Sequence, residues 1–275
     1  MPELPEVETI KRGLEKKVIG KKITGATVNL PKIINRSPAE FTRLLKNTII
    51  KKVARRAKIL MLTLSNGHTL GIHLKISGRL LYLKKNSPVE KHTHVIFDLN
   101  NGHQIRFWDL RRFGYVKLMR SEEAVKELKL DEFGPEPLTK EFTLDIFKNL
   151  LNQRKNSRIK PLLMDQGFVA GIGNIYADEI LFYARVHPLR PAGELSARET
   201  KDIFNGTKKI LTTAVQKKGT TVDLYVDLSG RAGNYVNYLK AYGCEDKPCV
   251  RCGARIQRIK IGSRSAHFCP RCQKQ

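Results

Sequence analysis

Long apolar runs are missing from this sequence of 275 residues. No stretch approaches the roughly 20 apolar residues that a helix needs to cross a bilayer, and none has the amphipathic, aromatic-bearing pattern of a membrane-surface anchor. The amino-terminal residues, MPELPEVETIKRG, lack the basic flank and apolar core of a secretory signal. Internal repeats and low-complexity segments are absent as well. We therefore expect a cytoplasmic globular protein.

Acidic residues are scarce relative to basic ones. The 26 Asp and Glu residues stand against 51 Lys and Arg residues, which gives a formal net charge of +25 and a pI of about 10.0. So large an excess predicts a polyanionic partner, because it far exceeds what an ordinary solvated surface carries. Since no membrane anchor is evident, nucleic acid is the partner that the composition favours.

Only five cysteines are present, and four of them form two close pairs near the carboxyl end. Cys249 and Cys252 are separated by two residues, as are Cys269 and Cys272, and 16 residues lie between the pairs. This spacing is typical of a zinc ribbon, in which two tight turns present four thiolates to one tetrahedral ion. Four thiolates leave no open coordination position, so we predict one structural Zn²⁺ and no catalytic metal or organic cofactor. The fifth cysteine, Cys244, has no evident partner.

Hydrophobic periodicity predicts an α+β multidomain fold. A helix is expected from Pro5 to about Val18. Eight short apolar or alternating runs follow between residues 22 and 118, and turn sequences separate two adjacent pairs of them, at residues 65–67 and 100–102. Many short strands at this spacing favour an antiparallel β-sandwich or barrel. From about residue 140 to 218 the apolar period becomes helical.

These changes of period set the domain limits that we predict. An N-terminal β domain covers residues 1–120, a charged interdomain linker covers 121–134, a helical domain covers 135–240 and the zinc ribbon covers 241–275. The polar stretch from about 220 to 238 is expected to be a long loop. Long loops within compact domains are usually functional or mobile.

The first residues carry the strongest candidate chemistry. If Met1 is removed, Pro2 becomes a free secondary amine. An α-amino group titrates near pH 8 and a lysine near 10.4, so the terminal amine is uncharged about 300 times more often at neutral pH and is the better nucleophile. Glu3 and Glu6 stand beside it at a helix start, where the helix dipole favours the carboxylate form. Composition alone leaves open that PELPE is only an ordinary helix start.

Six blocks together resemble one family. They are MPELPEVET at the amino end, RRAK at 55–58, DLRRFG at 109–114, GPEPL at 134–138, GIGNIYADE at 171–179 and the terminal pair of CxxC motifs. In this order they resemble formamidopyrimidine-DNA glycosylase over essentially the whole chain. The resemblance implies an N-terminal β-sandwich with flanking helices, a helix-two-turn-helix domain, a C-terminal zinc ribbon, and damaged double-stranded DNA bound across the cleft between the domains.

The resemblance also implies catalytic roles. Pro2 looks like the Schiff-base nucleophile, Glu3 like the acid that protonates the opening sugar, and Glu6 like a supporting carboxylate. Lys58 corresponds to the proton donor of β-elimination, and Arg264 to the ribbon arginine of δ-elimination and phosphate contact. A bifunctional enzyme is implied, which removes an oxidised purine (8-oxoguanine or a formamidopyrimidine) and then cuts the abasic strand.

A base that reacts must leave the stack, and the hole must be filled. By resemblance, Arg111 reads the orphaned cytosine and Phe113 wedges into the step. The family's third wedge is usually a methionine in HLxMSG, whereas this chain has the stiffer, β-branched Ile76. The resemblance further implies DNA contacts by His73, His92, Arg112, Asn156, Lys160, Asn174 and Tyr242. The segment at about 220–238 corresponds to the loop that closes over the flipped base.

Three alternatives remain at this point. One is an endonuclease VIII-like glycosylase for oxidised pyrimidines, and PELPE, Lys58 and RRFG argue against it. Another is a catalytically silent DNA-binding protein of the same fold, which retention of Pro2 and Glu3 disfavours. The last is a structural zinc-ribbon protein, which would not explain the amino-terminal block. The resemblance suggests a monomer that needs no membrane partner.

Overall fold

The computed structural model describes residues 1–274 and divides into two compact units. Unit 1 comprises Met1–Asp131 and Lys217–Asn234, and unit 2 comprises Glu132–Gln216 and the chain from Tyr235 onward. Within the described residues, no helix is both long and apolar enough to cross a membrane.

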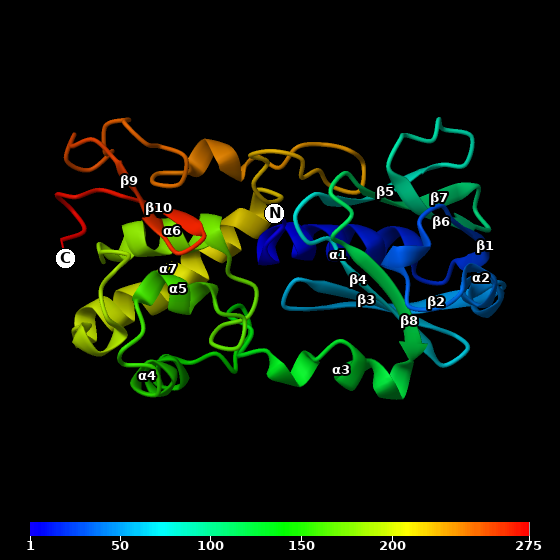
Figure 1. Ribbon diagram of the computed structural model, residues 1–275, viewed down its shortest axis with the longest axis horizontal. Coiled ribbons are helices and arrows are strands. Elements are labelled where there is room, and N and C mark those ends of the chain that lie inside the picture. Colours follow the sequence, from blue (N-terminus) through cyan, green and yellow to red (C-terminus); the bar gives the residue numbers. More distant parts are fainter. Residues whose placement is uncertain (275) are drawn as a thin grey trace. The chain divides into compact units, whose positions relative to one another are not determined.

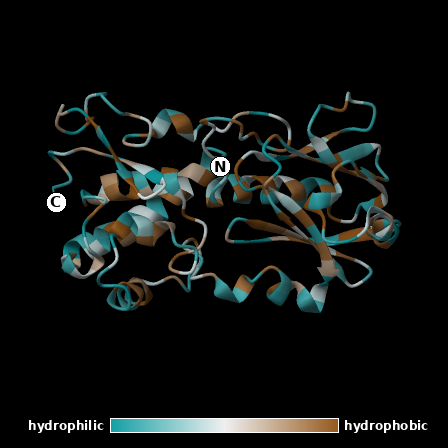
Figure 2. Ribbon diagram, in the orientation of Figure 1, coloured by the Kyte–Doolittle hydropathy of each residue, from teal (hydrophilic) through white to brown (hydrophobic). Residues whose placement is uncertain are grey.

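Unit 1 begins with helix α1 (Leu4–Val18), as the periodicity predicts. Proline in its first turn and a capping box between Glu3 and Glu6 define its start. Its apolar face is fully buried in the core of the unit, through Leu4, Val7, Ile10, Leu14 and Val18. Figure 2 shows the brown and teal residues that alternate along this amphipathic helix.

A short helix, α2 (Pro38–Leu45), was not predicted. Ser37 caps it by accepting the N–H of Glu40 at 3.3 Å, and Pro38 occupies its first turn. Phe41 and Leu45 then insert into the same core as α1. The Ser-Pro-x-Glu start was the available signal, because it combines an N-cap residue, proline and a first-turn carboxylate.

Eight antiparallel strands form the sheet of unit 1, and each corresponds to a predicted run. The strand order is β5-β7-β6-β1-β2-β3-β4-β8. Only two residue pairs join β1 to β2, so the sheet folds there into the two halves of a sandwich, which are visible as two groups of strands in Figure 1. The bounds are β1 Lys22–Val28, β2 Thr48–Arg56, β3 Ile59–Leu64, β4 His68–His73, β5 Gly78–Lys84, β6 Thr93–Leu99, β7 His103–Asp109 and β8 Tyr115–Arg120.

The predicted linker 121–134 differs from the structure. Its first part packs on unit 1 as the turn η2 (Ser121–Glu123) and helix α3 (Ala124–Glu127). Leu128 is buried, and its side chain lies so close to β4 that a Cβ on Gly71 would approach it to 2.6 Å. Charge and scarce aromatics suggested a linker, but a few apolar residues suffice to attach this segment to the sheet.

The segment Lys217–Asn234 also belongs to unit 1, whereas the predicted limits placed it with the helical domain. It has almost no regular structure, but Tyr225 and Leu228 enter the core of unit 1. The N–H of Tyr82 on β5 donates to the carbonyl of Leu228 at 2.8 Å. Arg79, also on β5, donates from Nε to the carbonyl of Leu224 at 2.6 Å and stacks over Trp108 at 4.4 Å. The segment is therefore a packed loop of the β unit.

Unit 2 contains the predicted helices and the ribbon. The helices are α4 (Leu144–Asn152), α5 (Ile159–Met164), α6 (Asn174–Ala184) and α7 (Ala197–Gln216). The ribbon hairpin consists of β9 (Gln257–Ile261) and β10 (Arg264–Phe268), paired antiparallel. Helix α6 is buried over almost its whole length and packs against both α7 and β10. It is the central element of this unit.

Candidate functional site

The start of α1 holds two buried carboxylates. Glu3 and Glu6 are each only 1% exposed. Both oxygens of Glu6 accept backbone hydrogens: Oε2 from the N–H of Glu3 and Oε1 from the N–H of Thr220, each at 2.7 Å. A Cβ on Gly219 would lie 2.8 Å from Oε1, so this approach requires glycine there. Glu6 is thus fully engaged and suits a supporting role.

Pro2 is buried directly before these carboxylates. With Met1 attached, its nitrogen is an amide and has no nucleophilic lone pair. Removal of Met1 turns that atom into a secondary amine beside Glu3. The predicted nucleophile therefore depends on processing of the chain.

Lys58 lies at the turn between β2 and β3, and its side chain is buried. Ala57 before it has a positive φ of 51°, a conformation that costs a residue with a Cβ about 1 kcal/mol or more. Arg55 holds this turn to α1, since it donates to the carbonyl of Ala57 at 2.8 Å and to Glu8 at 3.0 Å. Burial opposes ionisation of Glu8, but its hydrogen bonds to Arg12 and Arg55 lower its pKa. The RRAK motif thus builds a strained, anchored turn.

His73 ends β4, opposite Ile59 at the start of β3. Burial, together with the charges of Lys75 and Lys58, lowers its pKa to about 3. Its Nδ1 accepts the N–H of Lys75 at 2.9 Å. At neutral pH it is an uncharged imidazole, so any DNA contact by His73 is a hydrogen bond and not an ion pair. Ile76 follows, half-buried, in the turn before β5.

The DLRRFG motif forms a loop pinned by Asp109, which is fully buried. Its carboxylate accepts the hydroxyl of Ser77 and the N–H groups of Arg111 at 3.2 Å and Gly114 at 2.8 Å. Between these anchors, Arg112 has a φ of 58° and Phe113 is 54% exposed. The Arg111 guanidinium lies 5.1 Å from the Phe113 ring centroid. An exposed aromatic ring on a pinned loop is suited to insertion between bases.

Sequence reasoning missed Asp109 and Ser77 as the residues that hold this loop. Asp109 could have been found as the acidic residue of DLRRFG itself. His92, a predicted backbone contact, is half-buried just before β6, with its ring 5.9 Å from that of Trp108. The carbonyl of His92 accepts the N–H of Asp109 at 3.1 Å. Asp109 thus connects two of the predicted contact residues of unit 1, His92 and Arg111.

In unit 2, the Gly171-x-Gly173 turn leads into α6, whose first residue is Asn174. The Oδ1 of Asn174 is buried and makes no hydrogen bond within residues 1–274. The start of this 11-residue helix presents N–H groups and a positive dipole end, which favour an anion. Asn156 is exposed in the loop before α5. The DNA contacts that the resemblance implies for these two residues stay predictions.

The position of Lys160 differs from the expectation. The resemblance implies a DNA contact, but the side chain is only 2% exposed and its ammonium pairs with Asp178 at 2.7 Å. Sequence alone did not show that a lysine of α5 would find a carboxylate on α6. Tyr242 is half-buried, with its ring 5.1 Å from that of His267, and its N–H donates to Glu179.

The four cysteines of the ribbon converge. Their sulfurs all lie within 4.8 Å of one another, and no other group of metal-binding side chains was found among the described residues. Tetrahedral Zn–S bonds of about 2.3 Å require sulfurs about 3.8 Å apart, which this cluster allows. Backbone N–H groups point at two of the sulfurs, from Arg251 to Cys249 at 3.5 Å and from Cys272 to Cys269 at 3.4 Å. The donor set fits one structural zinc ion.

Arg264 lies exposed at the start of β10, beside the hairpin turn. A surface pocket of about 590 Å³ adjoins it, and its basic lining includes Arg258 and Lys260. One acidic residue, Glu245, lines the same pocket. The net positive lining favours a phosphate group.

Comparisons with known proteins identify the family and agree with the fold. Residues 1–116 match the formamidopyrimidine-DNA glycosylase N-terminal domain, residues 133–226 its H2TH domain, and residues 246–275 the zinc finger found in FPG and IleRS. The chain is 48% identical over 277 residues to the formamidopyrimidine-DNA glycosylase of Pelotomaculum thermopropionicum, covering 100% of this chain and 99% of that one. The chain belongs to the formamidopyrimidine-DNA glycosylase family.

Solved structures of the family carry DNA. The Lactococcus lactis Fpg in complex with abasic-site DNA is 34% identical, with a TM-score of 0.93, over 99% of this chain and 100% of that one. A point mutant of the same enzyme, in complex with DNA that contains Fapy-dG, gives a TM-score of 0.92 at 34% identity over the whole of both chains. The full-length match excludes the structural zinc-ribbon alternative. This chain is a zinc-finger DNA glycosylase of base excision repair, with the associated lyase activity.

Proposed function

We propose that the chain excises 8-oxoguanine and formamidopyrimidines from duplex DNA, with Pro2 as nucleophile, and then removes the abasic sugar. The observation that carries the proposal is that Pro2 and Glu3, adjacent residues at the start of α1, are both buried, and that Glu6 beside them accepts the N–H of Thr220. Relatives in complex with Fapy-dG and abasic-site DNA support the substrate class.

In the first step, the Pro2 nitrogen bonds to C1′ and the bond from C1′ to the base breaks. The Pro2 nitrogen loses its proton, and the base leaves with one proton gained. Glu3 protonates the ring oxygen as the sugar opens, which leaves an iminium ion between Pro2 and C1′. A buried carboxyl beside a developing alkoxide is well placed for general acid catalysis.

The iminium withdraws electrons from the sugar. Loss of a proton from C2′ breaks the bond from C3′ to its phosphate, and loss of a proton from C4′ breaks the bond from C5′ to the other phosphate. We assign proton transfer in the first elimination to Lys58. We assign the second elimination to Arg264 in the ribbon. Water then releases the unsaturated sugar from Pro2, leaving a gap with phosphate at both ends. When bound, zinc supplies no chemistry to these steps and shapes the ribbon.

DNA contacts come from both units. We propose that Phe113, Arg111 and Ile76 fill the space of the flipped base, and that Asn174, Asn156, Tyr242, His92, His73 and Arg112 position the backbone. Such contacts carry no sequence information, which suits an enzyme that surveys any sequence. We further propose a monomer that acts in the cytoplasm on nucleoid DNA.

The test uses purified protein whose loss of Met1 is verified by mass. It is incubated with a duplex that carries one 8-oxoguanine opposite cytosine, with and without borohydride. A cut strand and a borohydride-trapped adduct at Pro2 are expected. Glu3→Gln should bind the duplex but not cut it.

The same assay separates the alternatives. Faster excision of an oxidised pyrimidine than of 8-oxoguanine would assign the chain to the endonuclease VIII-like activity. Tight binding without a cut or an adduct would show a silent DNA-binding protein instead.

A further inference from the structure

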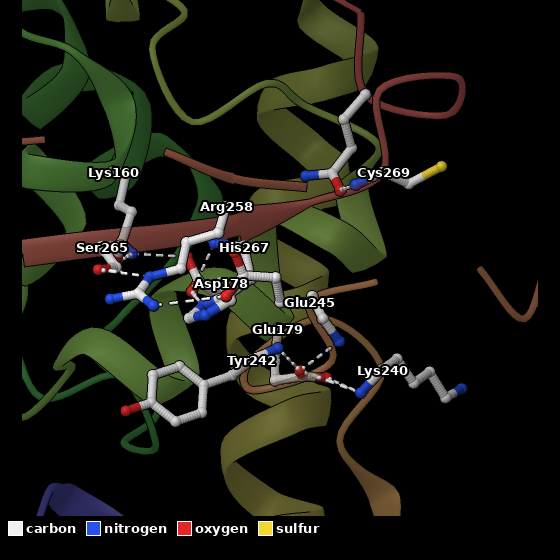
Figure 3. A network of polar contacts seen from close by, with 12 residues as sticks. Lys160, Asp178, Glu179, Lys240, Tyr242, Glu245, Arg258, Ser265, His267 and Cys269 are labelled. Atoms are coloured by element: carbon white, nitrogen blue, oxygen red, sulfur yellow. Dashed lines mark hydrogen bonds and ion pairs between the residues drawn. The ribbon is translucent and has the colours of Figure 1, made fainter. Parts of the chain in front are cut away.

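A buried ionic cluster lies in unit 2, formed by residues that take no part in the proposed chemistry. Lys160 on α5, Asp178 on α6 and His267 on β10 have side chains that are 2%, 1% and 10% exposed. The Lys160 ammonium lies 2.7 Å from Oδ1 of Asp178, and Oδ2 of Asp178 lies 3.0 Å from Nδ1 of His267. Figure 3 shows these side chains converging beside the ribbon strand.

The cluster makes hydrogen bonds to the backbone of β10 at two points, here called grips. Lys160 Nζ donates to the carbonyl of Ser265, and the N–H of His267 donates to Asp178 at 3.0 Å. The two grips are two residues apart on one strand. The first of them is the residue directly after Arg264, so Lys160 and, through it, Asp178 constrain the backbone beside Arg264 in addition to its pairing with β9.

The same helix turn carries the candidate phosphate site. Asp178 stands four residues after Asn174 on α6, so the two lie on the same face of the helix. Asn174 and Arg264 are thus connected by a short route through one turn of α6, the side chains of Asp178 and Lys160, and the backbone of β10.

A buried ion pair is a poor device for stability alone, because apolar residues of similar volume often do as well or better. It does impose direction, since charge-assisted hydrogen bonds tolerate little displacement. Apolar contacts alone would constrain the position of β10 on α6 less. The cluster therefore favours one position of β10.

We propose that Asp178, together with Lys160, is a positioning residue for Arg264, and that it holds Arg264 in register with the phosphate held at Asn174. This inference rests on the proposed function, in which Arg264 serves the second elimination. Loss of Asp178 should therefore impair δ-elimination selectively, and leave Schiff-base formation and β-elimination in place.

The ribbon has other attachments that should survive this change. Arg251 donates to the carbonyl of Phe182 in the last turn of α6 at 2.6 Å, and Gln273 donates to the carbonyl of Val186, just after α6, at 2.9 Å. The zinc ligands hold the base of the hairpin. Removing Asp178 is thus expected to release the Arg264 end of β10 and not to detach the ribbon.

The experiment measures product partition in single turnovers on a duplex with a preformed abasic site. Only active molecules form either product, so the ratio of β,δ-product to β-product does not depend on the fraction of protein that is folded. Asp178→Asn keeps the shape but leaves the Lys160 ammonium without a counter-ion. We expect this ratio to fall on the order of tenfold, since small misplacements have large kinetic effects. Borohydride trapping at Pro2 should stay within about twofold.

A second variant guards against misfolding. The double substitution Lys160→Met with Asp178→Leu removes both charges and leaves neither buried alone. It should retain one zinc per chain and show the same lowered ratio, because neither grip on β10 remains. A wild-type ratio in this zinc-loaded double variant would overturn the proposal, as would parallel loss of trapping and elimination in both variants.

Two references complete the design. Asp145→Asn removes an exposed ion pair with Lys148 in the same unit and should leave the ratio unchanged. Arg264→Gln should abolish the β,δ-product, and retention of that product would overturn the proposal. If the wild-type protein neither traps nor cuts, the proposed function itself is wrong. If it forms β,δ-product and the Asp178 variants do so equally, only the present inference fails.

Discussion

Glu6 and Thr220 are 214 residues apart in the chain, yet the carboxylate of one accepts the N–H of the other at 2.7 Å. The other oxygen of Glu6 accepts the N–H of Glu3, the residue that follows Pro2, at the same distance of 2.7 Å. One side chain thus joins the predicted nucleophile to the loop that the family resemblance places over the flipped base. In the proposed function, the nucleophile and the base pocket would therefore share Glu6 as a single support.

Glu6→Gln should damage that support. A glutamine amide offers one acceptor oxygen and one NH₂ donor, so it cannot accept from both N–H groups. A buried hydrogen bond to a charged group contributes about 1.5–3 kcal/mol, and we expect the free energy of unfolding to fall by about that amount. Denaturant unfolding measures it, and strand cleavage should fall at least about tenfold. Unchanged stability would contradict the hydrogen bonds described for Glu6.

Phe113→Ala should separate stability from function. The ring is 54% exposed, so its removal should change the free energy of unfolding by no more than about 0.5 kcal/mol. Affinity for a lesion-bearing duplex should fall on the order of tenfold, because the wedge is lost. Leu110, in the same loop and 46% exposed, provides the matched control. Equal losses for Phe113→Ala and Leu110→Ala would argue against a specific wedge.

Arg79→Gln tests the contact between strand β5 and the loop 217–234. The substitution removes the Nε donor to Leu224 and the stacking over Trp108. Excision of 8-oxoguanine should slow by roughly tenfold, whereas cutting of a preformed abasic site, which has no base to hold, should change by less than about twofold. Arg231→Gln, which removes the ion pair of the exposed Arg231 side chain with the buried Asp227 in the same loop, serves as control. Equal slowing on both substrates would show that Arg79 supports the whole unit.

His73 should contribute to acid sensitivity. Its pKa in the folded protein, about 3, is below the unfolded value near 6.5, because burial and two lysines oppose its protonation. Between these values the unfolded chain binds the extra proton, so stability is retained above about pH 6.5 and lost as the pH falls towards 3. One such group gives a slope of up to about 1.4 kcal/mol per pH unit. His73→Asn should flatten unfolding curves measured from pH 6.5 to 4.5, and an unchanged slope would rule His73 out as the cause.

Local patterns predicted the elements that local patterns determine. Helix α1 and all eight strands of unit 1 follow from apolar periods of 3.6 and 2, and the zinc ligands follow from spacing alone. Helix α2 was not predicted because eight residues are too few to show a clear hydrophobic period. The predicted linker was wrong for Leu128, whose burial depends on a gap over Gly71 that only the folded sheet contains.

The supports of the site were beyond local reasoning. Thr220 donates to Glu6 through its backbone N–H, and almost any residue type at position 220 could supply that group. Asp109 binds Ser77 across 32 residues, and Asp178 binds His267 across 89. Lysines are almost never fully buried unless paired, so an exposed Lys160 was the natural expectation. Asp178, whose carboxylate allows Lys160 to be buried, becomes adjacent to it only when α5 packs on α6.

Zinc content should distinguish the four cysteine ligands from the remaining cysteine, Cys244. Cys252→Ser takes away one of four converging sulfurs, and we expect zinc content to fall well below one per chain. Because zinc binding contributes directly to the folding of such small modules, the β9–β10 hairpin should lose order and strand cleavage should fall strongly. Zinc released on denaturation and cleavage of abasic DNA measure the two effects. Cys244→Ser is the matched control, since that thiol lies outside the four-sulfur cluster and donates to the carbonyl of Leu239 at 3.9 Å. Full zinc content in Cys252→Ser, or equal loss in Cys244→Ser, would contradict the four-thiolate assignment.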